Sequence, residues 1–256
     1  MGNLEGDRMA DLLLTIKELT DRYTFFFPEK FIREIGVNYQ DDLEERQRYT
    51  IDNLIDKYYN VITEYLSENN FESIIIGSSE GAFILPVLYE RLNSPKITAL
   101  ISDSGGGGLT RYEQYQIRYE KLLANDKSYA SLTEDERERE LQYFEKRMLI
   151  FKEEPYPESI DFIDDHPKAM TYRWVSSMMR LRLFDYYKNI GIPILFIHGE
   201  LDTDVPVETI RFIENNLLDK PFDYIYYPEG IHGITTRRQY SDRQRDISQW
   251  ILKVDQ

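Results

Sequence analysis

Two hydrophobic patterns alternate along this chain. Short apolar runs bounded by turn residues predict buried strands, and segments whose apolar residues recur every three or four positions predict helices. The predicted strands cover residues 23–27, 71–76, 96–103, 193–197 and 223–231, the last of which runs into a turn. The predicted helices cover residues 9–19, 50–65, 82–89, 211–218 and 242–254, and Thr50 is the candidate N-cap of the second. Strands that alternate with helices predict an α/β fold with a mostly parallel, doubly wound sheet.

The middle of the chain breaks this alternation. Residues 109–190 are rich in Glu, Arg, Lys and Tyr at helical spacing, which predicts a helical insert over the carboxyl end of the sheet. The charged run Glu134–Glu140 predicts a solvated helix face. Gly105–Gly108 form either a hinge or turn into the insert or a plain loop. The expected parts are residues 1–104 (core), 105–190 (insert) and 191–256 (core).

The segment Gly77-Ser78-Ser79-Glu80-Gly81 joins a predicted strand to a predicted helix. It matches the pattern G-x-S-x-G, in which the central serine occupies a turn too tight for side chains two positions to either side. The hydroxyl group of Ser79 then projects from the carboxyl end of the sheet, ahead of the helix N-terminus. This context favours a nucleophile. An ordinary loop with Ser79 as the helix N-cap is the alternative, because serine is a preferred cap.

A serine nucleophile needs a base within hydrogen-bonding distance. The chain has three histidines. His198 ends a predicted strand, where a packed structural histidine is the more common outcome, and His166 lies in a polar stretch where most histidines are solvated. His232 lies on a loop just past a strand, between Gly230 and Gly233, so its ring can reach a neighbouring strand end. We take His232 as the candidate base and keep an ordinary loop residue as the alternative.

The base needs an acid that orients it. Asp202 lies at the end of the strand that precedes His232, and Asp204 competes with it two positions later. Either aspartate could instead cap a helix that begins near Pro206. We assign Asp202 to catalysis and Asp204 to capping. The chain order is then Ser79, Asp202, His232, which is the order of α/β-hydrolases and differs from the orders in chymotrypsin and subtilisin.

Three segments carry a resemblance to a known family: IIIGSSEGAFILPVLYERL, IPILFIHGELDTDVPVE and YYPEGIHGI. They resemble the α/β-hydrolase superfamily, in which a segment like HGELDTDVP carries the acid. The resemblance covers the chain from about residue 9 to its end, apart from the insert. It implies hydrolysis of a carboxylic ester or thioester by a triad of Ser79, His232 and Asp202. The Ser-Glu-Gly ending is similar to the esterase, thioesterase and aminopeptidase-like branches.

The resemblance also implies where the substrate binds. In the family a helical cap shapes the pocket, so Tyr172, Trp174, Met178 and Met179 are expected either to line an acyl pocket or to form the packing face of the cap. The backbone N–H of Glu80 is expected to donate to the oxyanion. The Glu80 side chain is expected to point away from the nucleophile and to bind a substrate amine or pair with the cap.

One departure from the family affects the other oxyanion donor. Family members usually carry three more strands before the first predicted helix, and the second donor lies on the loop that enters this helix. This chain starts roughly at that loop, so we expect Met1–Asp7 to be its remnant, with the N–H of Gly2 or Asn3 as the donor. The chain is then either a fragment or a member with an N-terminally reduced sheet. Strands left unpaired at the gap would shift together or recruit a partner chain, which makes a homo-oligomer one expected arrangement.

Composition narrows the possible functions. The net charge of −15 argues against a nucleic-acid partner and against electrostatic docking on anionic membranes. The absence of cysteine excludes disulfides, thiol catalysis and cysteine-bound zinc. The histidines lack metal-binding spacing, so no metal or other cofactor is expected.

Neither a signal peptide nor an apolar run of membrane-spanning length is found, so we expect a cytoplasmic protein. A small-molecule acyl substrate is the expected partner. Aminopeptidase-like acyl hydrolysis and non-catalytic binding on the same fold are the alternatives.

Overall fold

The computed structural model describes part of the chain. The described residues are Tyr23, Thr24, Phe26 and the ranges 50–153, 171–179, 181–233 and 237–255. Several predictions from the sequence lie outside them: the helix over 9–19, the segment Met1–Asp7 with Gly2 and Asn3, and His166.

The strand predicted over residues 23–27 is described at three positions, and none of these is in strand conformation. The phenol of Tyr23 donates a hydrogen bond to Asp255 at 2.6 Å, near the end of the last helix. The ring of Phe26 stacks on Tyr65 with 4.2 Å between ring centroids. These contacts attach this segment to two separate helices.

Four parallel strands form the sheet of the described chain, in the order β1-β2-β3-β4. Their bounds are β1 (Ser73–Ser78), β2 (Ile97–Asp103), β3 (Ile194–Gly199) and β4 (Phe222–Tyr227). The prediction of these strands from short apolar runs is confirmed. Ser78 pairs with Asp103, and Asp103 pairs with Ile197. The residues at the carboxyl ends of the first three strands therefore lie side by side at one edge, where parallel sheets bind ligands.

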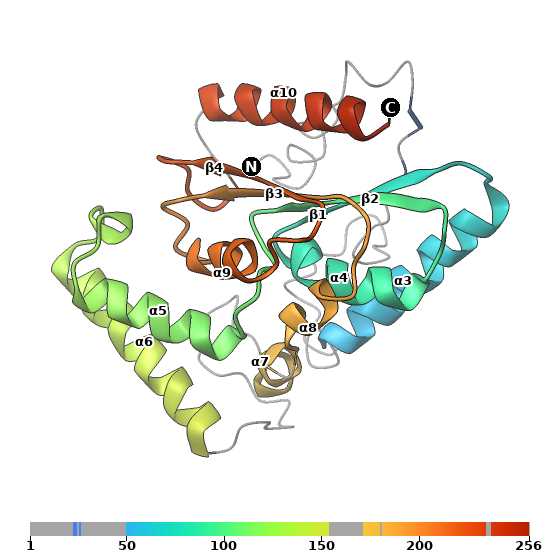
Figure 1. Ribbon diagram of the computed structural model, residues 1–256. Coiled ribbons are helices and arrows are strands. Elements are labelled where there is room, and N and C mark those ends of the chain that lie inside the picture. Colours follow the sequence, from blue (N-terminus) through green and yellow to red (C-terminus); the bar gives the residue numbers. More distant parts are fainter. Residues whose placement is uncertain are drawn as a thin grey trace, which may run out of the picture.

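Helices cover both faces of the sheet, as Figure 1 shows. One face carries α3 (Ile51–Glu68), α4 (Glu80–Leu92), α8 (Leu183–Tyr187) and α9 (Glu208–Asn216), and the other carries α10 (Arg237–Val254). The fold is therefore α/β with a doubly wound parallel sheet, as the sequence predicts. None of the described helices combines the length and apolarity that a membrane crossing needs.

The central strands are apolar on both faces because both faces are covered. Leu100 packs among the helices that include α3 and α4, and its neighbour Ile101 packs against α10. Ile194 and Leu195 on β3 divide in the same way, and all four side chains are fully buried. Each such side chain contributes roughly 1.5–3 kcal/mol when removed from water.

Helix α3 follows its sequence pattern closely. The hydroxyl of Thr50 accepts a hydrogen bond from the N–H of Asn53 at 3.2 Å, so the predicted N-cap is confirmed. The apolar stripe is buried at Ile51, Leu54, Ile55, Ile62 and Leu66. Its period of three to four residues matches the turn of an α-helix and directs one face to the core.

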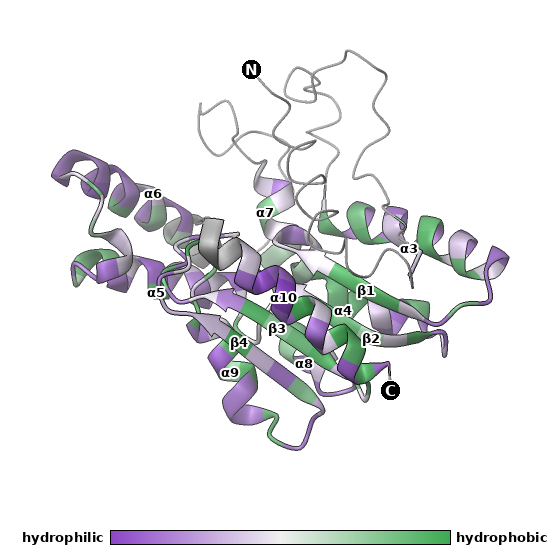
Figure 2. Cartoon of the chain, turned by 90° about the horizontal axis from the view of Figure 1, so that it is seen from above, coloured by the Kyte–Doolittle hydropathy of each residue, from purple (hydrophilic) through white to green (hydrophobic). Residues whose placement is uncertain are grey.

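Of the described helices between β2 and β3, all but α8 form a separate layer. They are α5 (Arg111–Leu123), the short 3-10 helix η3 (Lys127–Tyr129), α6 (Glu134–Glu153) and α7 (Tyr172–Met179). The charged run Glu134–Glu140 is largely exposed on α6, which confirms its assignment as a solvated face, and α6 is strongly hydrophilic in Figure 2. Thr110 and Glu113 form a capping box that starts α5.

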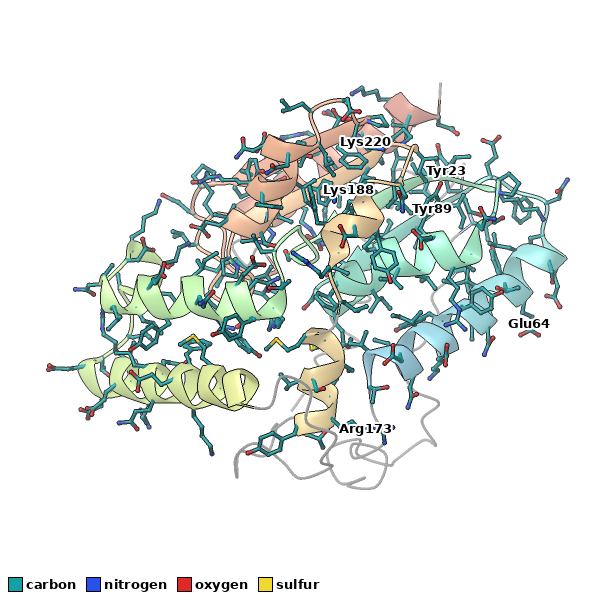
Figure 3. All side chains as sticks on the ribbon, turned by 60° about the horizontal axis from the view of Figure 1, so that its bottom comes forward. Tyr23, Glu64, Tyr89, Arg173, Lys188 and Lys220 are labelled. Carbon is teal, nitrogen blue, oxygen red and sulfur yellow. The ribbon has the colours of Figure 1, made fainter. Side chains whose placement is uncertain are left out.

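Helix α7 joins this layer to the core. Met178 packs in the core cluster that contains α4, whereas Val175 and Met179 pack with α5 and α6. The hydroxyl of Ser177 accepts from the N–H of Ile51 at 2.9 Å, at the start of α3. Arg173 lies on the exposed side of α7 (Figure 3).

The glycine run after β2 is buried, and close packing dictates its composition. A Cβ on Gly105 would lie 2.2 Å from the carbonyl oxygen of Ser79, and one on Gly107 would lie 2.2 Å from the hydroxyl of Thr209. Gly106 and Gly107 also have φ of +76° and +95°, which side chains disfavour. The run therefore packs between the Ser79 turn and α9.

We expect Gly107→Ala to lower the free energy of unfolding by about 2–4 kcal/mol, because it adds both backbone strain and an overlap with Thr209. Gly191→Ala is the matched control, since no atom lies within 4 Å of its Cβ position. Urea unfolding of both variants measures the difference. Equal stability of the two would show that the run is not held by this packing.

Candidate active site

Ser79 occupies a strained turn between β1 and α4. Its φ of 53° and ψ of −112° lie outside the regions that non-glycine residues normally adopt. The N–H of Ser79 donates to the carbonyl of Asp103 at 2.9 Å, and the Ser79 carbonyl accepts from the N–H of Phe83 at 3.0 Å. Backbone hydrogen bonds on both sides thus hold a conformation that costs roughly 1–3 kcal/mol.

The two glycines of the turn are not equivalent. A Cβ on Gly77 would lie 2.6 Å from the backbone of Gly81, so residue 77 must be glycine. A Cβ on Gly81 would have no atom within 4 Å. The expectation that the turn excludes side chains on both sides is therefore correct for Gly77 and wrong for Gly81.

The hydroxyl of Ser79 faces a histidine instead of capping the helix. Ser79 stands at the N-cap position of α4, but its side chain makes no capping hydrogen bond. Its Oγ lies 3.0 Å from Nε2 of His232. The structure thus does not support the N-cap alternative.

His232 in turn contacts the predicted acid. Its Nδ1 lies 2.9 Å from Oδ2 of Asp202, whose side chain is fully buried. Oδ1 of Asp202 accepts from the N–H groups of Asp204 and Val205 at 2.8 and 2.9 Å. Residues distant in the sequence are thereby joined in one hydrogen-bonded chain from hydroxyl to imidazole to carboxylate.

Asp202 and His232 lie on two loops that are joined by a backbone hydrogen bond. We call Asp202–Val205 the acid loop and Pro228–Gly233 the histidine loop. The N–H of Leu201 donates to the carbonyl of Gly230 at 2.8 Å. A Cβ on Gly199 would lie 2.4 Å from the same carbonyl, so glycine at that position lets the two loops approach. The close approach brings the ring of His232 over the acid loop.

The second described histidine lies on the other side of the acid. His198 is fully buried at the end of β3, and its Nε2 lies 2.8 Å from the carbonyl of Val205 and 3.5 Å from Oδ2 of Asp202. A carbonyl only accepts, so Nε2 of His198 carries the proton. The ring is a packed structural histidine, as the sequence predicts.

The surroundings move the pKa values of these histidines in opposite directions. Burial lowers the pKa of His198 below 6.5, against the opposing effect of Asp202. Burial also acts to lower the pKa of His232, but the hydrogen bond to Asp202 and the charges of Asp202, Asp204 and Asp103 raise it above 6.5. His198 therefore stays neutral while His232 readily accepts a proton, which a general base must do.

Asp204 does not cap a helix, so that prediction is wrong. The N-cap residue of α9 is Val207, and no side chain caps it. The carboxylate of Asp204 instead lies 3.6 Å from Arg118 on α5. Asp204 lies close to a helix start in the sequence, but its carboxylate pairs with Arg118 of the inserted helices instead.

A buried ion pair behind the serine turn is not evident from the sequence pattern. Asp103 is fully buried at the end of β2, where it accepts from Arg243 of α10 and from the hydroxyl of Ser78 at 3.1 Å. Arg243 shares a helix face with the buried Ile247 and Trp250. A charged residue on an apolar face is the signal that would have found it.

Glu80 and Trp174 are further residues that the sequence predicts at the site. Glu80 is the first residue of α4, and its charge is the second cause, after burial, that raises the pKa of Tyr58 on α3 to about 12. The Glu80 side chain therefore faces α3. Trp174 packs at the margin of the core cluster that contains Met178. In the described ranges, no group of three or more potential metal ligands comes together.

Comparison with known proteins supports the fold. The model of the prolyl oligopeptidase family matches residues 143–255. Est1E from Butyrivibrio proteoclasticus is similar in structure, with a TM-score of 0.52 and 16% identity over 80% of this chain and 71% of that one. The chain therefore has the α/β-hydrolase fold. These findings support a hydrolase enzyme.

Two further solved structures are similar with slightly lower TM-scores. A lipase-esterase related protein from Clostridium acetobutylicum has a TM-score of 0.49 and 18% identity, and covers 78% of this chain and 75% of its own. The acylaminoacyl peptidase of Pyrococcus horikoshii has a TM-score of 0.49 and 18% identity, and covers 82% of this chain but 29% of its own. The comparison with curated proteins gave no match.

The opposite pKa shifts can be measured directly. In a proton NMR titration we expect His232 to titrate above pH 6.5 and His198 below it. Asp202→Asn should lower the pKa of His232, because it removes the charge that stabilises the imidazolium. Asp185→Asn, an exposed site on α8, is the control that should leave it unchanged. A wild-type His232 that titrates below His198 would contradict the assignment of the base.

Proposed function

We propose that this α/β-hydrolase cleaves a carboxylic ester or thioester by covalent catalysis at Ser79. The observation that carries the proposal is the hydrogen-bonded chain from Ser79 through His232 to the buried Asp202, combined with the strained conformation of Ser79. A small-molecule acyl substrate fits this chemistry.

Each side chain has one role in the proposed reaction. Oγ of Ser79 attacks the acyl carbonyl carbon while Nε2 of His232 takes the hydroxyl proton. His232 then gives this proton to the leaving oxygen or sulfur, and an acyl-serine ester remains. Asp202 fixes the tautomer of His232 and stabilises the imidazolium. Water, activated by the same ring, releases the acid and restores the serine.

The oxyanion is assigned to backbone donors. The N–H of Glu80 begins α4, whose dipole favours negative charge at this end. Each donor of this kind is typically worth ~3 kcal/mol of transition-state stabilisation. The N–H of Gly2 or Asn3 stays our proposal for the second donor, on a segment outside the described residues.

The inserted helices are proposed to act as a cap. They follow the carboxyl end of β2 and precede β3, and helix α7 joins them to the core through Met178. In this proposal residues 105–190 form the cap between two core parts, and Trp174 and Met178 border the acyl pocket from α7. Mutation of Trp174 would then alter the preference for acyl length.

Aminopeptidase-like acyl hydrolysis is the second candidate. The match to the prolyl oligopeptidase family over residues 143–255 favours it, because that region contains Asp202 and His232. In this candidate the carboxylate of Glu80, the residue that follows Ser79 in the sequence, would bind a cationic amino terminus. The leaving group then becomes an amine in place of an alcohol or thiol.

We expect Ser79→Ala to abolish labelling by a fluorophosphonate probe and to lower kcat for p-nitrophenyl butyrate by about 10⁴-fold or more, since the nucleophile is lost. Ser78→Ala is the matched control, because its hydroxyl contacts Asp103 and lies outside the triad. Intact labelling in folded Ser79→Ala would rule out Ser79 as the nucleophile.

Glu80→Gln separates the two candidates. If Glu80 binds a substrate amine, this change should reduce kcat/KM for an aminoacyl p-nitroanilide by about 10-fold or more and leave that for p-nitrophenyl butyrate nearly unchanged. The measurement is the ratio of the two kcat/KM values in wild type and variant. An unchanged ratio would remove the aminopeptidase-like candidate.

A further inference from the structure

The acid loop is held from two sides by side chains of different elements. On its inner side, Nε2 of His198 donates to the carbonyl of Val205 at 2.8 Å. On its outer side, the inserted helices reach the two preceding carbonyls. The phenol of Tyr129 donates to the carbonyl of Thr203 at 3.4 Å. The carbonyl of Asp204, which lies between these two, also accepts from side chains. Three successive carbonyls of the loop are therefore each bound by a side chain.

The middle carbonyl, that of Asp204, faces two arginines of α5. Nη1 of Arg111 donates to it at 3.3 Å and Nη1 of Arg118 at 3.5 Å. Nη2 of Arg118 lies 3.6 Å from the carboxylate of the same residue. Each contact is long, but all three converge on one residue of the acid loop.

Arg118 is placed to act on Asp204 and cannot easily swing away. Its exposed fraction is only 9%, and its guanidinium stacks over the ring of Phe144 on α6, 4.4 Å from the centroid. A guanidinium cannot lose its charge, so its burial must be offset by a nearby anion or acceptor. Asp204 supplies both its carboxylate and its carbonyl oxygen.

Asp204 connects this cation to the triad. Its N–H donates to Oδ1 of Asp202 at 2.8 Å, and Oδ2 of Asp202 lies 2.9 Å from His232. We propose that Arg118, assisted by Arg111, is a positioning residue: α5 holds the acid loop through Asp204 and thereby holds Asp202 against His232. The inference rests on the proposed function, and it gives the inserted helices a part in catalysis besides shaping a pocket.

The charge of Arg118 adds an effect that a purely mechanical role would lack. The charged groups around His232 are Asp202 and Asp204 of the acid loop and Asp103 of β2, which is paired with Arg243 of α10; His198 faces it from β3. Arg118 partly offsets the charge of Asp204. Loss of this cation alone would raise the pKa of His232, but displacement of Asp202, whose hydrogen bond and charge raise that pKa most, would lower it by more.

The chain offers a matched control on the same helix. Lys121 lies one turn after Arg118 and pairs with Glu208 of α9 at 2.8 Å. This pair also joins α5 to the core but does not touch the acid loop. Lys121→Met therefore removes a comparable link and leaves Asp204 in place.

The test compares Arg118→Met, Arg118→Lys and Lys121→Met. The readouts are kcat and KM for p-nitrophenyl butyrate and the NMR titration of His232. We expect Arg118→Met to lower kcat by about 10–100-fold with little change in KM, because a displaced acid misaligns the base. His232 should titrate at lower pH in this variant, because it loses the hydrogen bond and the nearby charge of Asp202. Arg118→Lys should restore the titration and part of kcat, and Lys121→Met should change neither.

Folded Arg118→Met with the kcat and His232 titration of the wild type would overturn the proposal, as would the same losses in Lys121→Met. If Arg118→Met does not fold, Arg111→Gln removes a donor to the same carbonyl and must lower kcat for the proposal to stand. Failure of wild-type Ser79 to react with the fluorophosphonate would refute the proposed function instead. The His232 titration would still test the link from Arg118.

Discussion

The buried carboxylate of Asp202 is the group on which the candidate site depends. Burial of an ionised carboxylate is costly unless hydrogen bonds satisfy it. Asp202 meets this demand with two backbone N–H groups on one oxygen and His232 on the other. The arrangement explains why the residues after Asp202 turn back on themselves, and why the charge of Asp202 raises the pKa of His232.

A second constraint is the strain at Ser79, and the fold supplies its support. The serine turn is held by Asp103 through a backbone hydrogen bond, and Gly105 packs directly against the Ser79 carbonyl. Asp103 is itself fixed by Arg243 from the opposite face of the sheet. The elements that position the hydroxyl therefore come from both layers of the molecule, so the geometry of the serine is a property of the whole core.

Local patterns were enough to predict much of this architecture. The apolar runs located the four strands, and the spacing of Ile51, Leu54 and Ile55 with Thr50 before them located α3 and its cap. The order of Ser79, Asp202 and His232 selected residues that the structure brings together. These signals are readable because strand burial, helix capping and tight turns each depend on a few neighbouring residues.

Long-range contacts were not predictable in the same way. Asp103 and Arg243 are separated by 140 residues, and the local sequence around either one does not indicate that they pair. Asp204 looked like a helix cap because its local sequence permits one, but Arg118 on a distant helix determines its role. The sequence of the glycine run after β2 is compatible with a hinge, a turn or a plain loop, whereas the crowding that requires glycine comes from Ser79 and Thr209.

The proposed function requires Ser79, His232 and Asp202 to act together in acyl transfer. Rapid acid quenching of the protein with p-nitrophenyl acetate, followed by peptide mapping, tests it most directly. The account predicts an acetyl group on the peptide that carries Ser79, formed in a burst by the wild type and far more slowly by His232→Ala. Acetylation at another residue, or a burst that persists without His232, would contradict the account.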